Sequence, residues 1–301
     1  MQVDTKVFRS LSRLRLRAPS AVRGRQQGER RARATGSGVE FADHRPYQSG
    51  DDLRRVDWNA WQRQPSQVLM RLFSEDRNMR VAVLVDATGS MGTRSGNGNQ
   101  TKLDHAGTLA ACFALLSLTN RDFIRVGSYG SADGARAATG HDMGAMPGVL
   151  KLLQKTRVGH TCGDPKSTLL GLAGGRRSDV AVLLSDMLSP EDEMEETLRA
   201  LATLGHTPIL LQVVSPDDLD PDLSKPQRLV DAETGESLEL PGGPDLKRAW
   251  QIARDAWLED LDARCRRLGI RRVLVRTDTD PVQTFREDLR RAGIVVLGAR
   301  G

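Results

Sequence analysis

The sequence predicts an α/β protein with a mostly parallel sheet and helices on both of its faces. From residue 80 to the end, short apolar runs of strand length alternate with longer stretches of helix length, which is the pattern of βαβ units. The runs at 81–85, 180–184 and 208–214 are apolar at nearly every position. Such runs are expected for strands that are buried on both faces of a parallel sheet.

The elements can be placed in order along the chain. Val68, Met70 and Leu72 would share one face of a first strand, the segment 102–118 has a nearly continuous apolar side, and Pro190 stands where a helix would begin. Strands are expected at residues 67–75, 81–85, 123–129, 135–139, 179–184, 208–214, 272–276 and 294–297, with a hairpin at 229–240. Helices are expected at residues 102–118, 143–154, 191–204, 245–268 and 282–291.

The positive charge of the chain is concentrated at its N-terminus. Residues 1–35 contain ten Lys or Arg and two acidic residues, although the whole chain has a formal net charge of +5. We expect a basic, flexible arm at 1–35, a segment at 36–78 that packs on the main domain, and the main domain at 79–301. The arm fits a solvated tail with a short docking helix, a contact with an anionic membrane surface or a contact with nucleic acid. Nucleic acid is disfavoured because residues 20–38 contain no aromatic side chain for base stacking.

The composition excludes several classes of protein. No run of about 18 apolar residues is present that would span a membrane, and Met1–Arg17 lacks the apolar core of a secretory signal. Cys112, Cys162 and Cys265 form no CxxC pair, which argues against a disulfide framework or a cysteine zinc site. We expect a cytoplasmic protein, with contact with the inner membrane through the arm as the alternative.

The strongest functional signal lies at the end of the strand 81–85. Asp86, Thr88 and Ser90 follow this strand at every second position. Ligands of open α/β sheets bind at the carboxyl ends of the strands, and a carboxylate with two hydroxyls suits Mg²⁺, Mn²⁺ or Ca²⁺. The sequence therefore predicts a divalent-metal site, preferably for Mg²⁺, at this edge of the sheet.

A second aspartate follows another predicted core strand. Asp186 comes after the strand 179–184 and Ser185, so it reaches the same edge if the two strands are neighbours. A threonine from the segment between them, Thr161 or Thr168, would complete the ligand set. The other interpretation is that both aspartates only cap the loops that follow them. Three further polar residues near this edge are not expected to be ligands: Thr93, His105 and His160.

Two motifs resemble known families. The run Asp86-Ala87-Thr88-Gly89-Ser90 resembles the metal-ion-dependent adhesion site motif, Asp-x-Ser-x-Ser, of von Willebrand factor A domains, which have a Rossmann-like fold. The run Gly50-Asp51-Asp52-Leu53-Arg54-Arg55-Val56-Asp57-Trp58, preceded by Arg45-Pro46-Tyr47, closely resembles the signature of the bacterial family called domain of unknown function 58. This resemblance extends over residues 36–297.

The resemblance implies a ligand set. Asp86, Thr88 and Ser90 would form the first metal loop, Thr161 would be the threonine ligand because Gly159 precedes it as in the motif, and Asp186 would be the second aspartate. Thr88 replaces the usual serine, and its methyl group restricts the rotamers. A further departure is the loop 162–165, which follows Thr161 where the family often continues directly into a helix.

The signature run itself is expected to be structural rather than a binding surface. In this interpretation the polar residues pair with one another and the tryptophans pack on the main domain. The residues concerned are Asp51, Asp52, Arg54, Asp57, Trp58 and Trp61.

The resemblance implies a non-catalytic protein-binding module whose metal coordinates an acidic side chain of a partner. The partner would be a MoxR-type AAA+ ATPase or its client, and the pair would act in protein or complex maturation. A site with two carboxylates that act mainly through water is expected to bind Mg²⁺ weakly until a partner completes the coordination shell.

Two alternatives remain. The first is a scaffold that is tethered to a membrane or to nucleic acid through the basic arm. The second is a metal-dependent phosphohydrolase with Asp86 as the nucleophile, as in haloacid dehalogenase-like phosphatases. The second is disfavoured because those enzymes carry another aspartate two residues later, where this chain has Thr88. The chain also has no phosphate-binding P-loop and no Gly-x-Ser-x-Gly elbow.

Overall fold

The computed structural model describes residues 10–17, 39–47, 56–63, 68–75, 78–94, 100–159, 165–172, 174–175, 177–232 and 235–298. The chain forms two compact units, one of residues 1–25 and 79–301 and one of residues 26–78. None of the helices in the described part of the chain has the length and hydrophobicity that a membrane span requires.

A six-stranded sheet forms the centre of the larger unit, in the order β11-β8-β7-β4-β5-β6. Its strands β11, β8, β7, β4 and β5 run parallel, and β6 is antiparallel to β5 at the edge. The predicted mostly parallel sheet is thus confirmed. The strands are β4 (Arg80–Asp86), β5 (Phe123–Tyr129), β6 (Arg136–Gly140), β7 (Ser178–Ser185), β8 (Gly205–Val214) and β11 (Arg271–Arg276).

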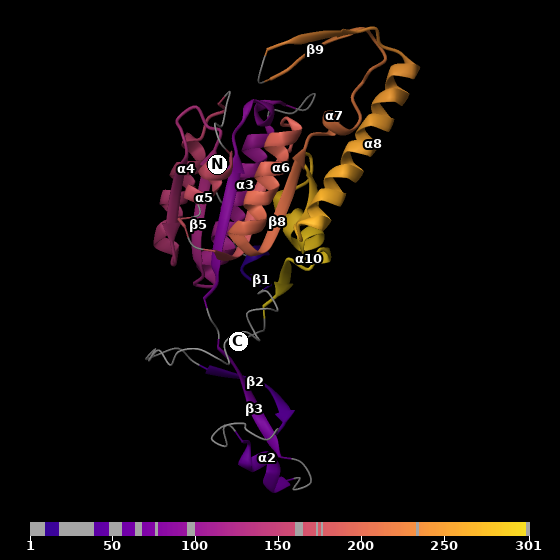
Figure 1. Ribbon diagram of the computed structural model, residues 1–301. Helices are drawn as coiled ribbons and strands as arrows, with labels where there is room; N and C mark the ends of the chain where they lie inside the picture. The colour runs from indigo at the N-terminus through magenta and orange to yellow at the C-terminus, as the bar shows by residue number, and fades with distance from the viewer. Residues whose placement is uncertain are drawn as a thin grey trace. The chain divides into compact units, whose positions relative to one another are not determined.

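Helices cover both faces of this sheet (Figure 1). The side chains of Val81, Val83 and Val85 on β4 pack into a core with the helices α3 and α4, whereas Leu84 packs into a second core with α5, α6 and α8. Successive side chains of a strand point to opposite faces, so an unbroken apolar run is needed when both faces are covered. The helices are α3 (Lys102–Thr119), α4 (Met146–Lys155), α5 (Pro165–Leu172), α6 (Glu191–Leu204) and α8 (Pro244–Arg267).

The first residue of α3 is fixed by a capping box. The Thr101 hydroxyl accepts a hydrogen bond from the Asp104 backbone N–H at 3.0 Å, and the Asp104 carboxylate accepts one from the Thr101 backbone N–H at 3.0 Å. This reciprocal pair satisfies two backbone donors that the first helical turn leaves free. Lys102 therefore stands directly behind the cap, at the end of α3 that faces the carboxyl ends of the strands.

The N-terminal segment is tied to the C-terminal one. Strand β1 (Leu14–Leu16) pairs antiparallel with β12 (Val295–Leu297), and Leu11, Leu14 and Leu16 are at most 4% exposed. The described residues 10–17 of the expected arm at 1–35 are therefore held within the larger unit, with helical residues 10–11 before the strand. Alternation of Leu and Arg from residue 13 to 17 places the leucines on one side of a strand and the arginines on the other.

Two elements connect β8 with β11 besides α8. The short helix α7 (Pro216–Leu219) begins directly after β8, and the hairpin of β9 (Gln227–Val230) and β10 (Ser237–Leu240) follows it. Figure 1 shows α8 as a long helix that returns from this hairpin along the sheet. The predicted hairpin and long helix are both present.

The segment before β12 departs from the predicted helix at 282–291. It consists of α9 (Pro281–Gln283), a π-helical segment (Thr284–Asp288) and α10 (Leu289–Arg291). Phe285 in the π segment is fully buried and packs on Phe113 of α3, with ring centroids 4.7 Å apart. A one-residue expansion of the helix of this kind is not encoded in a 3.6-residue apolar period.

The described residues of the smaller unit form a two-stranded antiparallel ribbon and a short helix. Strand β2 (Val39–Pro46) pairs with β3 (Leu69–Glu75), and the helix is α2 (Trp58–Arg63). The Asp57 carboxylate caps this helix by accepting hydrogen bonds from the backbone N–H groups of Asn59 and Ala60. The rings of Trp58 and Trp61 meet edge to face. The expected packing of these tryptophans on the main domain stays a prediction. Asp51, Asp52 and Arg54 lie outside the described residues.

Candidate metal centre

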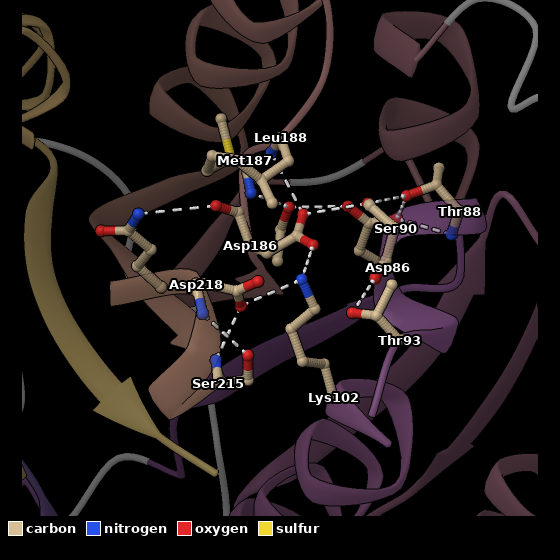
Figure 2. A network of polar contacts seen from close by, with 12 residues as sticks. Asp86, Thr88, Ser90, Thr93, Lys102, Asp186, Met187, Leu188, Ser215 and Asp218 are labelled. Atoms are coloured by element: carbon tan, nitrogen blue, oxygen red, sulfur yellow. Dashed lines mark hydrogen bonds and ion pairs between the residues drawn. The ribbon is translucent and has the colours of Figure 1, made fainter. Parts of the chain in front are cut away.

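The two predicted aspartates meet at the carboxyl edge of the sheet. Strands β4 and β7 are parallel neighbours, with Val85 opposite Leu184. The chain leaves β4 at Asp86 and β7 at Ser185, directly before Asp186. Figure 2 shows both carboxylates pointing into one cluster of polar side chains. Asp86 is 5% exposed and Asp186 is 1% exposed.

Asp86 is held by three donors. Its Oδ1 accepts hydrogen bonds from the Thr88 backbone N–H at 2.9 Å and from Thr88 Oγ1 at 2.8 Å. Its Oδ2 accepts one from Ser185 Oγ at 2.6 Å. Both carboxylate oxygens are therefore oriented by groups from two neighbouring strand ends.

The second hydroxyl joins the two aspartates. Ser90, in the 3₁₀ turn η3 (Gly89–Gly92), has its Oγ 3.4 Å from Thr88 Oγ1 and donates to Asp186 Oδ1 at 3.2 Å. Asp186 Oδ1 also accepts from the Leu188 backbone N–H at 3.1 Å. The structure thus brings Asp86, Thr88, Ser90 and Asp186 together in one continuous chain of oxygen contacts (Figure 2).

Buried carboxylates shape the electrostatics of this cluster. Burial raises the pKa of Asp86, and the nearby carboxylate of Asp186 raises it further, against the lowering effect of the hydrogen bonds from Ser185 and Thr88. A low-dielectric site penalises two neighbouring negative charges. A divalent cation between the two aspartates would remove this penalty.

A pocket opens over the cluster. Thr88, Tyr129 and the segment after β7 contribute to its wall. The half-buried Glu193, in the first turn of α6, brings a third carboxylate to the wall. The lining residues are Asp86, Thr88, Tyr129, Ser185, Asp186, Met187, Leu188, Ser189, Glu193 and Thr197.

Two glycines hold the loops of this edge close together. Gly130 has φ +70° and lies so near Thr88 that a Cβ atom would meet Thr88 Cγ2 at 2.7 Å. The Gly159 N–H donates to the Ala87 carbonyl at 2.9 Å, and a Cβ atom there would meet the Gly130 carbonyl oxygen at 2.2 Å. Only glycine allows this approach without movement of the backbone. The loop that leads to Thr161 therefore starts beside the loop that carries Thr88.

The two threonine candidates have different outcomes. Thr161 lies outside the described residues, as does His160. Thr168 lies on α5 and is half-buried, and it is not among the described residues that line the pocket. Thr93 Oγ1 donates to the Ser90 carbonyl at 2.9 Å, which supports the turn rather than the pocket. The choice between Thr161 and Thr168 stays a prediction.

Sequence reasoning missed four residues of this site. Lys102 donates to Asp186 Oδ2 at 2.7 Å and lies 3.2 Å from Asp218 Oδ2. Ser185 orients Asp86, and Glu193 lines the pocket. A signal did exist for Asp218, because it follows the apolar run 208–214 as Asp186 follows the run 180–184.

The residues fit a hard divalent cation. Among the described residues no group of three or more His, Cys, Asp or Glu could hold a metal, so a metal here depends on the hydroxyls of Thr88 and Ser90. Carboxylate and hydroxyl oxygens suit Mg²⁺, which keeps several of its waters in protein sites. A set of two carboxylates and two hydroxyls leaves room for those waters.

Relatives of the chain are found among mycobacterial proteins. Uncharacterized proteins of Mycobacterium bovis and of Mycobacterium tuberculosis are 28% identical to it over 290 residues, which cover 92% of this chain and 87% of each relative.

Similar solved structures come from Bacteroides. The conserved hypothetical protein BatB of Bacteroides thetaiotaomicron superimposes with a TM-score of 0.44 at 12% identity, over 72% of this chain and 99% of that one. An aerotolerance-related membrane protein of Bacteroides fragilis gives a TM-score of 0.38 at 11% identity, over 72% of this chain and 99% of that one.

The family model described as protein of unknown function DUF58 matches residues 43–256. This range includes the whole signature run, the whole oxygen cluster and the first half of α8. The chain therefore belongs to the family of proteins of unknown function DUF58.

Proposed function

We propose that the larger unit is a von Willebrand factor A-like domain whose oxygen cluster binds a divalent cation, preferably Mg²⁺, and that the chain is a non-catalytic, metal-dependent protein-binding module. One observation carries the proposal. Ser90 Oγ lies within 3.4 Å of Thr88 Oγ1 and 3.2 Å of Asp186 Oδ1, so the loops after β4 and β7 bring their oxygens together beside the pocket that Asp86, Thr88 and Asp186 line.

In this proposal Asp86, Thr88, Ser90 and Asp186 hold the ion, with Thr161 as the further ligand. The bound ion would supply an electrophilic coordination position for a carboxylate of another protein. The pocket wall supports this role because Met187 and Leu188 stand beside the acidic residues, and Leu188 is 45% exposed. The core of a protein interface is apolar and its rim is polar, so the exposed Leu188 offers apolar contact area next to the proposed ion.

The partner we propose is an acidic side chain of a MoxR-type AAA+ ATPase or of its client. The acidic ligand follows from the charge of the metal. The class of partner follows from the family resemblance. The expected role is protein or complex maturation.

Metal binding is tested first. The purified chain is titrated with Mn²⁺, and free Mn²⁺ is measured by electron paramagnetic resonance. We expect Asp86→Ala and Ser90→Ala to weaken binding by at least about tenfold, which corresponds to about 1.4 kcal/mol. The matched control is Asp133→Ala, which removes an exposed carboxylate from the same edge of the sheet. Equal affinities of the wild type and both site variants would contradict the proposal.

Partner binding is tested second, by affinity capture with the wild type and Asp86→Ala, each in Mg²⁺ and in EDTA. We expect a MoxR-type ATPase or its client to be retained only by the wild type in Mg²⁺. Retention in all four conditions would place the interface elsewhere. Phosphate release from a generic phosphatase substrate that is lost in Asp86→Asn would favour the phosphohydrolase alternative.

A further inference from the structure

A buried lysine stands behind the candidate metal centre. Lys102 begins α3, and its side chain is 1% exposed. Figure 2 shows its ammonium group between the carboxylates of Asp186 and Asp218. The Nζ atom lies 2.7 Å from Asp186 Oδ2 and 3.2 Å from Asp218 Oδ2.

This lysine is charged. Its ammonium group donates a hydrogen bond to the Asp186 carboxylate and forms a second ion pair with the Asp218 carboxylate. A buried ammonium group is tolerated only when it is paired in this way. A fixed positive charge therefore belongs to the centre itself.

The lysine divides the two oxygens of Asp186. Oδ2 is taken by Lys102, whereas Oδ1 faces Ser90 and the Leu188 backbone N–H. Asp186 is thus held in place without a metal, and only one of its oxygens faces the candidate ion. A cation bound at the oxygen cluster would share the Asp186 carboxylate with the ammonium group and would be repelled by its positive charge.

We propose that Lys102 is an internal counter-ion of the metal centre, which keeps Asp186 in position when no metal is bound and lowers the affinity of the centre for divalent cations. This inference rests on the proposed metal function. As a consequence, the metal and the partner are expected to bind together. The positive charge of Lys102 offsets part of the negative charge of the centre, and the carboxylate of a partner supplies that negative charge again. Each ligand then raises the affinity for the other by the same factor.

The test compares the wild type with Lys102→Met, which keeps the length of the side chain and removes its charge. Affinity is measured with Mn²⁺ alone, by the resonance of the free ion, and the melting temperature is measured in EDTA and in Mn²⁺. We expect Lys102→Met to bind Mn²⁺ at least about tenfold more tightly than the wild type. The single positive charge of the lysine and the double charge of the ion repel each other even where the dielectric screening is as strong as in water. We also expect a lower melting temperature in EDTA and a larger rise on addition of Mn²⁺.

Two further variants make the result specific. Lys102→Arg keeps the positive charge and is expected to bind Mn²⁺ no more tightly than the wild type. Lys102→Met/Asp86→Ala is expected to lose the gain, because the ion would then lack its first carboxylate. If Lys102→Met does not fold, Lys102→Met/Asp218→Asn removes the ammonium group with its outer partner, and we expect it to bind more tightly than the wild type.

The outcomes separate this inference from the proposed function. If the wild type binds Mn²⁺ and Lys102→Met binds it no more tightly, the counter-ion role of Lys102 is overturned and the metal centre stands. Binding by Lys102→Met and not by the wild type supports the counter-ion and overturns metal dependence of the native chain. Absence of binding in every variant overturns both.

Discussion

Ser185 Oγ lies 2.6 Å from Asp86 Oδ2, and this hydrogen bond joins the ends of β7 and β4. Ser185 also accepts a hydrogen bond from the Met187 backbone N–H at 3.0 Å. Hence the Ser185 hydroxyl orients the carboxylate of Asp86 and also supports the turn from Ser185 to Met187, which contains Asp186. Both residues are buried, so water cannot replace this contact without rearrangement.

Ser185→Ala is expected to destabilise the chain. The variant leaves Asp86 Oδ2 without its donor, and hydrogen bonds to charged groups contribute about 1.5–3 kcal/mol. We expect a loss of this size in the free energy of unfolding, measured with urea in EDTA. Ser189→Ala is the matched control in the same pocket wall, with an expected change within about 0.5 kcal/mol. Equal free energies of unfolding for the two variants would show that the hydrogen bond from Ser185 to Asp86 contributes nothing to stability.

The local motif of the site was readable in the sequence because it lies on one short segment. An apolar strand followed by Asp86, Thr88 and Ser90 needs only the rule that ligands gather at the carboxyl ends of strands. Asp186 was found by the same rule. Lys102 could not be found by this rule. Its role depends on the order of the sheet, which places β8 next to β7 and so brings Asp218, which follows β8, close to Asp186.

The elements that sequence reasoning missed depend on distant partners. Strand β2 at 39–46 shows no clean alternation and is defined by its pairing with β3. Strand β1 has three residues and is defined by β12, which is about 280 residues away along the chain. Helix α5 at 165–172 was also not expected, because its eight residues are too few for a clear apolar period.

Gly130→Ala is expected to disturb the metal loop. A side chain at a positive φ costs about 1–2 kcal/mol, and the new Cβ atom would also press on Thr88 Cγ2 at 2.7 Å. The control is Gly134→Ala, which has a similar φ of +79° but no atom within 4 Å of the new Cβ. We expect Gly130→Ala to be less stable than Gly134→Ala by about 1–3 kcal/mol, the usual cost of overpacking.

The same pair of variants is titrated with Mn²⁺. Only Gly130→Ala is expected to weaken binding, because it displaces Thr88. If both variants lose equal stability and retain equal affinity, Gly130 is required for its backbone conformation alone and not for its approach to Thr88.

The buried thiols are expected to be inert in the folded protein. Burial raises the pKa of Cys112 to about 12 and that of Cys265 to about 11, so almost no reactive thiolate forms near pH 8. In a Cys162→Ser variant, we expect no reaction with a disulfide reagent at pH 8 until guanidinium chloride unfolds the chain and both thiols react. A thiol that reacts in the folded variant within minutes would contradict the burial of that cysteine.

His105 is expected to make the stability depend on pH. Its side chain is fully buried, and neither ring nitrogen has a hydrogen-bond partner among the described residues. Burial lowers the pKa of His105, although the carboxylates of Asp278 and Asp280 act in the opposite direction. The unfolded chain therefore binds a proton near pH 6.5 that the folded chain does not bind, and stability is lost as the pH falls below this value.

The measurement is the free energy of unfolding in urea and EDTA between pH 7.5 and pH 5, for the wild type and His105→Gln. We expect the wild type to lose up to about 1.4 kcal/mol per pH unit more than the variant below the pKa of the unfolded chain. His141→Gln is the control, since the side chain of His141 is 76% exposed and is expected to leave the pH profile unchanged. A constant difference between the wild type and His105→Gln over this range would mean that His105 takes up its proton equally in both states, in conflict with its apolar surroundings.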